Sequence, residues 1–360
     1  MRIAVLGVGL IGGSIGLAAR ARIGAEVCGY DPDPDVTARA LELRAVDRAA
    51  GSVAEAVGDA AAVFVAAPVG VLPAVVGEAL AVAPADCVVS DVGSTKRLLA
   101  AAAADPRFVG GHPLAGAETQ GVEHAREDLF DGATWYLTPA RESTAGVLYE
   151  RLHALLRRLG ARPTAIDAET HDRLMACVSH LPHVLANLLA AQAAGTLEDP
   201  GEGAERLPAV GPSFRDAIRV AGASSAIWTD IYLSNADALL AAIAELEGRL
   251  DQVRAMLSSA DAGALGAWNE SARADRDALL GSGMAGGSAN ELRVQVPNRP
   301  GVVAEIALAL GEAGVNIGDM VLSPSPDNSR GVIALWIGGE GPAARAESVV
   351  HGLGFPVVRA

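Results

Sequence analysis

The first 166 residues alternate apolar runs with segments rich in Ala and Leu. The runs at 2–7, 25–31 and 60–68 are apolar almost throughout, which is typical of strands buried on both faces. Strands of this kind, separated by helical segments, predict a parallel sheet with helices on both sides. We therefore expect an α/β domain over residues 1–166, with further strands at 86–93, 107–113, 133–140 and 161–166 and a helix at 145–160.

The pattern changes at Asp167, where the strand-like runs stop. From there on, apolar residues recur at helical spacing, and we expect an all-α domain over residues 167–280. Pro182 removes one backbone donor inside this region and predicts a helix kink. The longest helical segments are expected at 169–194, 213–222 and 227–257.

The last part of the chain has a third pattern. Residues 281–290 are rich in Gly, Ser and Ala, a composition typical of a flexible linker. Residues 291–360 then follow the order strand, helix, strand, strand, helix, strand. This order predicts a small α+β domain of the ferredoxin-like type.

Charge and cysteine content narrow the class of partner. The 360 residues carry a formal net charge of −15, which repels phosphate backbones and anionic membranes, so neither nucleic-acid nor lipid binding is expected. No apolar stretch is expected to span a membrane, and the chain begins with a strand pattern instead of a signal peptide. Cys28, Cys87 and Cys177 are too far apart to predict a disulfide framework or a zinc site. A cytoplasmic protein without a metal site is the expectation.

A glycine-rich turn joins the first strand to the first helix. Gly7, Gly9 and Gly12 form a G-x-G-x-x-G motif directly after an apolar strand. In such motifs the first glycine allows a tight turn, the second lets the backbone approach a pyrophosphate, and the third lets the helix pack closely on the strand. The helix N-terminus then offers free N–H groups to the phosphates. The motif predicts a Rossmann-like dinucleotide site, and a purely structural turn is the alternative.

Asp31 indicates which dinucleotide is bound. It ends the second predicted strand, about 20 residues after the motif, where a carboxylate accepts hydrogen bonds from the ribose hydroxyls of NAD and repels the 2′-phosphate of NADP. A simple turn residue in the stretch DPDP is the alternative. The predicted cofactor-binding residues are Gly7, Gly9, Leu10, Ile11, Gly12, Asp31 and Pro68.

Two motifs at the carboxyl edge of the predicted sheet carry candidate chemistry, because ligands of open α/β sheets collect there. Ser94, in the stretch DVGSTK, is either a site hydroxyl or the N-cap of a helix over 95–104. Lys96 is a second candidate, either as an acid at the site or on the solvated surface of that helix, which is the commoner position for a lysine. His112 lies where the predicted strand at 107–113 is expected to pass into a loop, between glycines and a proline, and imidazole exchanges protons near neutral pH. His112 is therefore the candidate base.

The helical domain adds further candidates. His180 and His183 are three residues apart and share one helix face, whereas His171 is expected about 180° away from His180 on a straight helix. Arg219 lies in an apolar stretch, where a buried guanidinium needs a partner. That partner is either Asp216 or a substrate carboxylate, which Arg binds in bidentate fashion.

Five stretches, taken together and in order, resemble the prephenate/arogenate dehydrogenase family. The family has a Rossmann-like domain followed by a helical dimerisation domain, so the resemblance implies a homodimer. Residues 298–317 in addition resemble an ACT-type regulatory domain, a ferredoxin-like unit that commonly binds amino acids. The stretches are GVGLIGGS (7–14), DVGSTK (91–96), GGHPLAG (110–116), VSHLPHVLA (178–186) and SFRDAIRVA (213–221) followed by IWTDI (227–231).

The resemblance implies an NAD-dependent oxidative decarboxylation of prephenate to 4-hydroxyphenylpyruvate, a step of tyrosine biosynthesis. It implies that His112 accepts the proton of the C4 hydroxyl while hydride leaves C4, and that Ser94 orients the hydroxyl or the histidine. Arg219 would clamp a substrate carboxylate, and His183 would line the substrate pocket with His180 beside it. Tyrosine is the expected effector, with Asn298 and Asn316 as the residues to test for contact with it.

Three other functions remain open at this point. Arogenate, which would be converted to tyrosine, is the alternative substrate, and Gln120 stands where the family usually has Ser. A β-hydroxyacid dehydrogenase would need a catalytic lysine in the helical domain, and residues 167–280 contain no lysine. A non-catalytic sensor of nucleotides and amino acids is the last alternative.

Overall fold

The computed structural model describes residues 1–116, 119–139, 146–195, 210–283, 289–325 and 329–359. The chain forms two compact units, Met1–Glu247 and Gly248–Ala360, and the division falls within the helix α10 (Ala236–Ser258).

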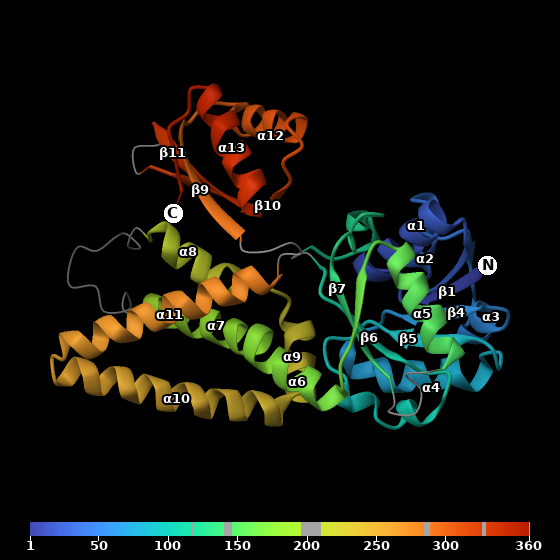
Figure 1. Ribbon diagram of the computed structural model, residues 1–360. Helices are drawn as coiled ribbons and strands as arrows, with labels where there is room; N and C mark the ends of the chain where they lie inside the picture. Colours follow the sequence, from blue (N-terminus) through green and yellow to red (C-terminus); the bar gives the residue numbers. More distant parts are fainter. Residues whose placement is uncertain (117–118, 140–145, 196–209, 284–288, 326–328, 360) are drawn as a thin grey trace, which may run out of the picture. The chain divides into compact units, whose positions relative to one another are not determined.

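A five-stranded parallel sheet forms the centre of the first unit (Figure 1). Its strand order β3-β2-β1-β4-β5 places the glycine-rich turn after the central strand β1. The strands are β1 (Arg2–Leu6), β2 (Glu26–Tyr30), β3 (Arg48–Ala49), β4 (Ala62–Val65) and β5 (Val88–Asp91). The helices between them are α1 (Leu10–Ile23), α2 (Pro34–Glu42), α3 (Val53–Val57), the short 3₁₀ turn η1 (Val69–Val71) and α4 (Leu72–Val82).

Alternate residues of β1 belong to different apolar cores. Ile3 and Val5 pack in a cluster with Ile15 of α1, whereas Ala4 and Leu6 pack in the cluster that contains α3 and α4. Each fully buried Val, Leu or Ile contributes about 1.5–3 kcal/mol, so the sheet is stabilised from both faces. The predicted Rossmann-like sheet, covered on two sides, is confirmed.

The strand that carries His112 belongs to a second sheet, which differs from the prediction. β6 (Gly110–Pro113) pairs antiparallel with β7 (Thr134–Thr138), and β7 pairs parallel with β8 (Arg162–Ala165). One isolated β-bridge, Val89 to Phe108, connects the residues just before β6 to β5. The helix α5 (Val147–Arg158) precedes β8, as expected, and a 3₁₀ turn, η4 (Val122–His124), lies between β6 and β7.

The helix predicted over 95–104 is wrong, since this segment forms two 3₁₀ turns, η2 (Arg97–Leu99) and η3 (Ala102–Ala104). The Asp172 carboxylate accepts hydrogen bonds from the backbone N–H groups of Lys96 and Arg97, and the Lys96 side chain is buried. Ser94 therefore caps no helix.

The helical part of the first unit begins with one long helix that contains a π turn. α6 (Ala168–Met175) continues through the π turn η5 (Ala176–His180) into α7 (Leu181–Gly195). The Leu181 N–H donates to the Ala176 carbonyl, and the kink expected at Pro182 thus takes the form of a widened turn. The next helices are α8 (Pro212–Ile218), η6 (Arg219–Gly222), α9 (Ser225–Ser234) and α10.

By length and composition, Ala168–Gly195 is apolar enough to cross a membrane, contrary to the expectation from the sequence. His171, Asp172, His180 and His183 on this helix are buried among other parts of the first unit.

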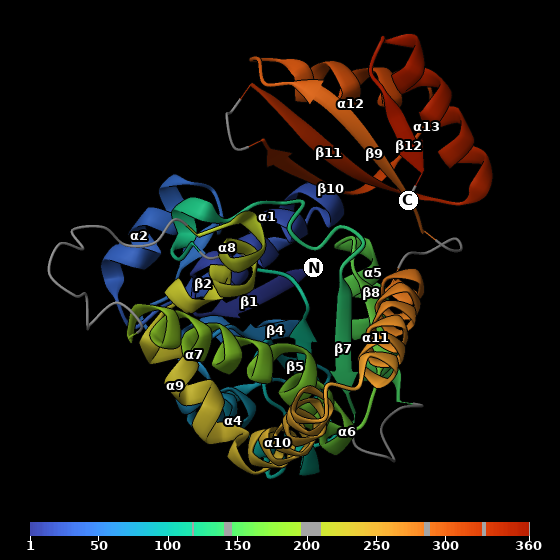
Figure 2. The same ribbon diagram turned by 90° about the vertical axis from the view of Figure 1, so that its left-hand side faces the viewer.

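The second unit contains α11 (Ala262–Gly283) and an antiparallel sheet of order β10-β11-β9-β12. α12 and α13 lie on the same face of this sheet (Figure 2). The predicted ferredoxin-like order is confirmed. At the ends of the predicted linker 281–290, α11 reaches Gly283 and β9 begins at Ala289, and 284–288 lie outside the described residues. The elements are β9 (Ala289–Pro297), α12 (Val302–Glu312), β10 (Ile317–Pro324), β11 (Arg330–Gly338), α13 (Glu340–Gly352) and β12 (Val357–Arg359).

Candidate functional site

The glycine turn after β1 has the geometry of a nucleotide cradle. Gly7 has a φ of +91°, and a Cβ there would lie 2.5 Å from the Ala66 carbonyl oxygen at the end of β4. A Cβ on Gly12 would lie 2.0 Å from the Gly7 carbonyl oxygen, so the helix packs as closely as the motif predicts. A Cβ on Gly9 would meet no atom within 4 Å. Since no side chain caps α1 at Gly9, the open space lies in front of a helix N-terminus that offers N–H groups.

Asp31 lies beside this turn. Its Oδ2 accepts a hydrogen bond of 3.0 Å from the Val8 N–H, and its Oδ1 accepts one of 3.1 Å from the Asp33 N–H. The carboxylate thus stabilises the glycine turn and the start of α2 at once, and remains half-exposed. Pro68 lines a cavity of about 480 Å³ whose other lining residues come from α9, namely Ser225, Ala226, Ile227, Thr229 and Asp230.

A buried ion pair joins β5 to β6 beneath the site. The side chains of Lys96 and Asp91 are fully buried and paired, and Lys96 Nζ also donates to the Gly111 carbonyl at 2.6 Å. Asp91 Oδ1 in turn accepts from the Gly111 N–H at 3.0 Å. Both backbone groups of the residue before His112 are therefore held by one ion pair, and the expected surface position of Lys96 is wrong.

His112 lies on β6 itself and not in a loop, paired with Tyr136 of β7. Two glycines precede it because the strand passes close to β5, where a Cβ on Gly111 would lie 2.5 Å from the Asp91 carbonyl oxygen. His112 Nδ1 lies 2.9 Å from His171 Nε2, and the two rings meet edge to face. The His112 residue is partly exposed, and among the described residues no hydrogen bond to its other nitrogen, Nε2, is found.

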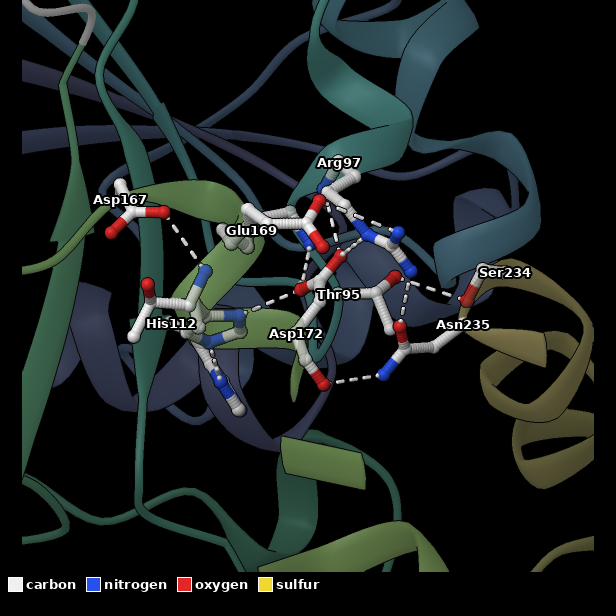
Figure 3. A network of polar contacts seen from close by, with 12 residues as sticks. Thr95, Arg97, His112, Asp167, Glu169, Asp172, Ser234 and Asn235 are labelled. Atoms are coloured by element: carbon white, nitrogen blue, oxygen red, sulfur yellow. Dashed lines mark hydrogen bonds and ion pairs between the residues drawn. The ribbon is translucent and has the colours of Figure 1, made fainter. Parts of the chain in front are cut away.

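His171 connects His112 to the buried carboxylate of Asp172; His112 and Asp172 are labelled in Figure 3. His171 Nδ1 lies 2.8 Å from Asp172 Oδ1, and both side chains are fully buried. Asp172 also accepts from the Lys96 N–H at 2.8 Å and from the Arg97 N–H at 2.9 Å. The helix that carries His171 is thereby fixed to the segment after β5.

Asn235 closes the network from the junction of α9 and α10. Its Nδ2 donates to the Asp172 carbonyl at 2.7 Å and lies 3.2 Å from His180 Nδ1. Arg97 donates to Asn235 Oδ1 at 2.8 Å and forms an ion pair with Asp237 in the first turn of α10. His180 and His171, predicted on opposite sides of the helix, therefore share one network, because the π turn between them changes the helical register.

His183 lies in an aromatic cluster next to this network. Its ring stacks on Trp228 with 3.6 Å between the ring centroids and 7° between the planes, and its Nδ1 is hydrogen-bonded to the Tyr232 hydroxyl. His180 contacts the same indole edge to face at 6.2 Å. The two histidines share one helix face, as predicted from their spacing.

Two predicted residues are placed differently from the expectation. Arg219 is exposed on η6, so the reasoning from a buried guanidinium is wrong, and its proposed contact with a substrate carboxylate rests on the resemblance alone. Ser94 is half-buried in the turn after β5, where it caps no helix, and its contact with the substrate hydroxyl or with His112 stays a prediction.

Asn298 and Asn316 are far apart in the second unit. Asn298 follows β9, with its N–H donating to the Ser329 carbonyl, whereas Asn316 precedes β10. β9 and β10 run in the same direction on either side of β11, so these residues lie at opposite ends of the sheet. One small effector cannot contact both within one copy of the unit.

Burial shapes the protonation of the site. It lowers the pKa of His112 well below 6.5, and the neighbouring His171, Lys96 and His180 act in the same direction. Burial lowers the pKa of His180 to about 4. Burial alone would raise the pKa of Asp172, but hydrogen bonds from His171 and from the backbone of Arg97 and Lys96 lower it. A neutral imidazole and an ionised carboxylate are therefore present at neutral pH.

His171, Asp172 and Asn235 are the residues that sequence reasoning missed, and Lys96, although a candidate, was expected mainly on a helix surface. One signal was available for Lys96, which is the only lysine of the chain. A chain that uses Arg at all its other cationic positions keeps a lysine where a compact ammonium is required. The pattern of the sequence contains no comparable signal for the contact between His171 and His112, which are 59 positions apart.

Comparison with known families agrees with this geometry. The model of the prephenate dehydrogenase nucleotide-binding domain matches residues 15–164, that of the prephenate dehydrogenase dimerization domain 167–269, and that of the ACT domain 290–338. A prephenate dehydrogenase of Bacillus subtilis is 32% identical over 97% of this chain and 95% of its own length.

Solved structures are similar as well. Prephenate dehydrogenase from Aquifex aeolicus, in complex with hydroxyphenyl propionate and NAD+, superposes with a TM-score of 0.68 at 26% identity, over 77% of this chain and 97% of that one. Arogenate dehydrogenase from Synechocystis superposes with a TM-score of 0.66 at 28% identity, over 78% of this chain and 100% of that one.

Proposed function

Since the chain belongs to the prephenate dehydrogenase family, we propose that it catalyses the NAD-dependent oxidative decarboxylation of prephenate to 4-hydroxyphenylpyruvate. The observation that carries the proposal is His112, a partly exposed imidazole that is neutral at neutral pH. It lies at the sheet edge where the open space at Gly9 would hold a dinucleotide. This oxidation requires a base that removes the hydroxyl proton and, close to it, a hydride acceptor.

The residues of the first unit fit NAD. Gly7, Gly9 and the N-terminus of α1 would hold the pyrophosphate, and Asp31 would accept hydrogen bonds from the adenosine ribose. When bound, NAD supplies an electrophilic nicotinamide ring that accepts hydride.

His112 would perform the proton chemistry. Its Nε2 would take the proton of the C4 hydroxyl, while the hydrogen of the C4–H bond leaves with its electron pair as hydride, which bound NAD would accept. The C1–carboxylate bond then breaks, carbon dioxide leaves, and the electron pair of that bond makes the ring aromatic. The proton returns to the phenolate oxygen, so His112 is unchanged after the cycle.

Other residues would bind the substrate. Arg219 would pair with a substrate carboxylate, and Ser94 would contact the C4 hydroxyl beside His112. His183 would line the pocket, with its ring held rigidly against Trp228. Arogenate carries an amino group where prephenate has a carbonyl, and the similarity to the Synechocystis enzyme makes it the second candidate substrate.

We also propose that the enzyme is a cytoplasmic homodimer inhibited by tyrosine. The matches to a dimerization domain and an ACT domain support dimer formation and an amino-acid effector.

The test measures NADH formation with prephenate and, separately, with arogenate. Faster turnover of prephenate supports the proposal, and faster turnover of arogenate assigns the second substrate. No turnover of either overturns the proposed function and favours a sensor. His112→Asn is expected to lower kcat about 10²- to 10⁴-fold, as for loss of a general base.

A further inference from the structure

We propose that His171 and Asp172 are positioning residues for the base, so that Asp172 holds His171 and His171 holds His112 with its Nε2 lone pair toward the substrate. The inference rests on the proposed function of His112. It deepens that function by assigning the orientation of the base to two buried residues of α6. The distances are 2.9 Å from His112 Nδ1 to His171 Nε2 and 2.8 Å from His171 Nδ1 to Asp172 Oδ1.

The direction of each hydrogen bond follows from the carboxylate. An ionised Asp172 can only accept, so His171 must carry its proton on Nδ1. His171 Nε2 is then a bare acceptor, and His112 must donate from Nδ1. The neutral His112 is left with no proton on Nε2, which is the form that a base needs. We assign both tautomers from this network.

Hydrogen bonds from the segment after β5 fix the orientation of the Asp172 carboxylate toward His171. Asp172 accepts from the backbone N–H groups of Lys96 and Arg97, and Arg97 Nε lies 3.2 Å from its Oδ2. Tyr136 packs edge to face against His171 on its other side, with 5.7 Å between the ring centroids. These contacts leave His171 one orientation, because its ring and its partner are both fixed.

The hydrogen bonds from His112 through His171 to Asp172 also stabilise the positive charge that His112 acquires during the reaction. A proton on His112 creates a cation close to the ammonium of Lys96, which is itself paired with Asp91, and near the neutral His180. Asp172 is the anion that His112 reaches through His171. The imidazolium is therefore stabilised by a carboxylate that does not itself take the proton.

The first test observes the tautomers directly and does not require turnover. In the full-length protein with ¹⁵N-labelled histidine, NMR is expected to show His112 protonated on Nδ1 and His171 on Nδ1. In Asp172→Asn, the amide can donate to His171 Nδ1, which reverses both bonds and places the His112 proton on Nε2. An unchanged His112 tautomer in Asp172→Asn would overturn the proposal.

The second test is kinetic, with a matched control. Asp172→Asn is expected to lower kcat about 10²- to 10⁴-fold with little change in KM, while His171→Gln, which can keep a donor and an acceptor in place, is expected to lose much less. Asp237→Asn makes the same change in another carboxylate that pairs with Arg97, and is expected to keep kcat within about twofold because Asp237 does not contact His171.

A double variant separates positioning from structural damage. If Asp172 acts through His112, adding Asp172→Asn to His112→Asn lowers the residual kcat no further. A further loss in the double variant, equal to the loss in the single one, would refute the proposal. If the parent protein oxidises neither substrate, the proposed function fails, while the NMR result still decides whether His171 and Asp172 orient His112.

Discussion

Replacing Lys96 by Met removes a buried charge while nearly keeping the volume of the side chain. The Asp91 carboxylate would stay fully buried and would retain only its backbone donors, Gly93 at 2.8 Å and Gly111 at 3.0 Å. Removal of one partner from a buried ion pair costs about 3–5 kcal/mol, because the other charge is left uncompensated. The Gly111 carbonyl also loses its donor. We expect Lys96→Met to lower the free energy of unfolding by this amount.

The assay is urea unfolding followed by circular dichroism. With a slope near 3 kcal/mol/M for a chain of this size, the midpoint should fall by roughly 1–1.7 M. Lys96→Arg should also destabilise the protein, since a guanidinium does not fit the space of an ammonium. Arg39→Gln, which breaks the exposed pair with Glu42, is the control and should change stability by less than about 1 kcal/mol.

The double variant Asp91→Asn/Lys96→Met checks the physical reason. It removes both charges, and we expect it to be more stable than Lys96→Met by about 1–4 kcal/mol. If Lys96→Met loses less than about 1 kcal/mol, or if the double variant is the less stable of the two, the loss does not come from a stranded carboxylate and the reasoning is refuted.

Four further predictions concern the ligands. Because burial lowers the pKa of His112 below 6.5, kcat should keep its neutral value as the pH falls through 6.5 and decline only in more acidic buffer; a half-maximal rate at or above pH 6.5 would contradict this. Asp31→Ser should raise the KM for NAD about tenfold or more, since a hydrogen bond to a charged acceptor contributes about 1.5–3 kcal/mol. It should also reduce the preference of the enzyme for NAD over NADP. An unchanged ratio of kcat/KM for the two dinucleotides counts against the ribose contact. Arg219→Ala should raise the KM for prephenate about 30-fold or more, and an unaltered KM would rule out the carboxylate clamp. Of Asn298→Ala and Asn316→Ala, only one should weaken inhibition by tyrosine, and equal effects of both would refute a site confined to one end of the sheet.

The parts of the site that could be predicted are those set by local geometry. The roles of Gly7 and Gly12 follow from a turn and a helix start within a few residues, and the structure shows the close contacts that leave no room for a Cβ. The spacing of His180 and His183 likewise predicts a shared helix face. Each of these inferences needs only the dihedral angles of one segment.

Other parts depend on packing between distant segments. His171 could not be grouped with His180, because the angle between them was taken from a straight helix and the π turn changes it. Lys96 was expected on a helix surface, but no such helix forms where Asp172 captures the backbone donors. His112 was expected in a loop, since the pairing of β6 with β7 depends on a strand more than 20 residues away.

The π turn at Ala176–His180 lets the two halves of one long helix pack against different parts of the first unit. Before the turn, α6 contacts β7 and η2, and after it α7 contacts α8 and η6. The extra residue in the π turn rotates α7 relative to α6 about the helix axis. The face of α6 that packs on β7 and the face of α7 that packs on α8 therefore need not lie on the same side of the helix. Each half can therefore vary its contact residues without rotating the other, while His171 before the turn and His180 at its end are still linked through Asp172 and Asn235.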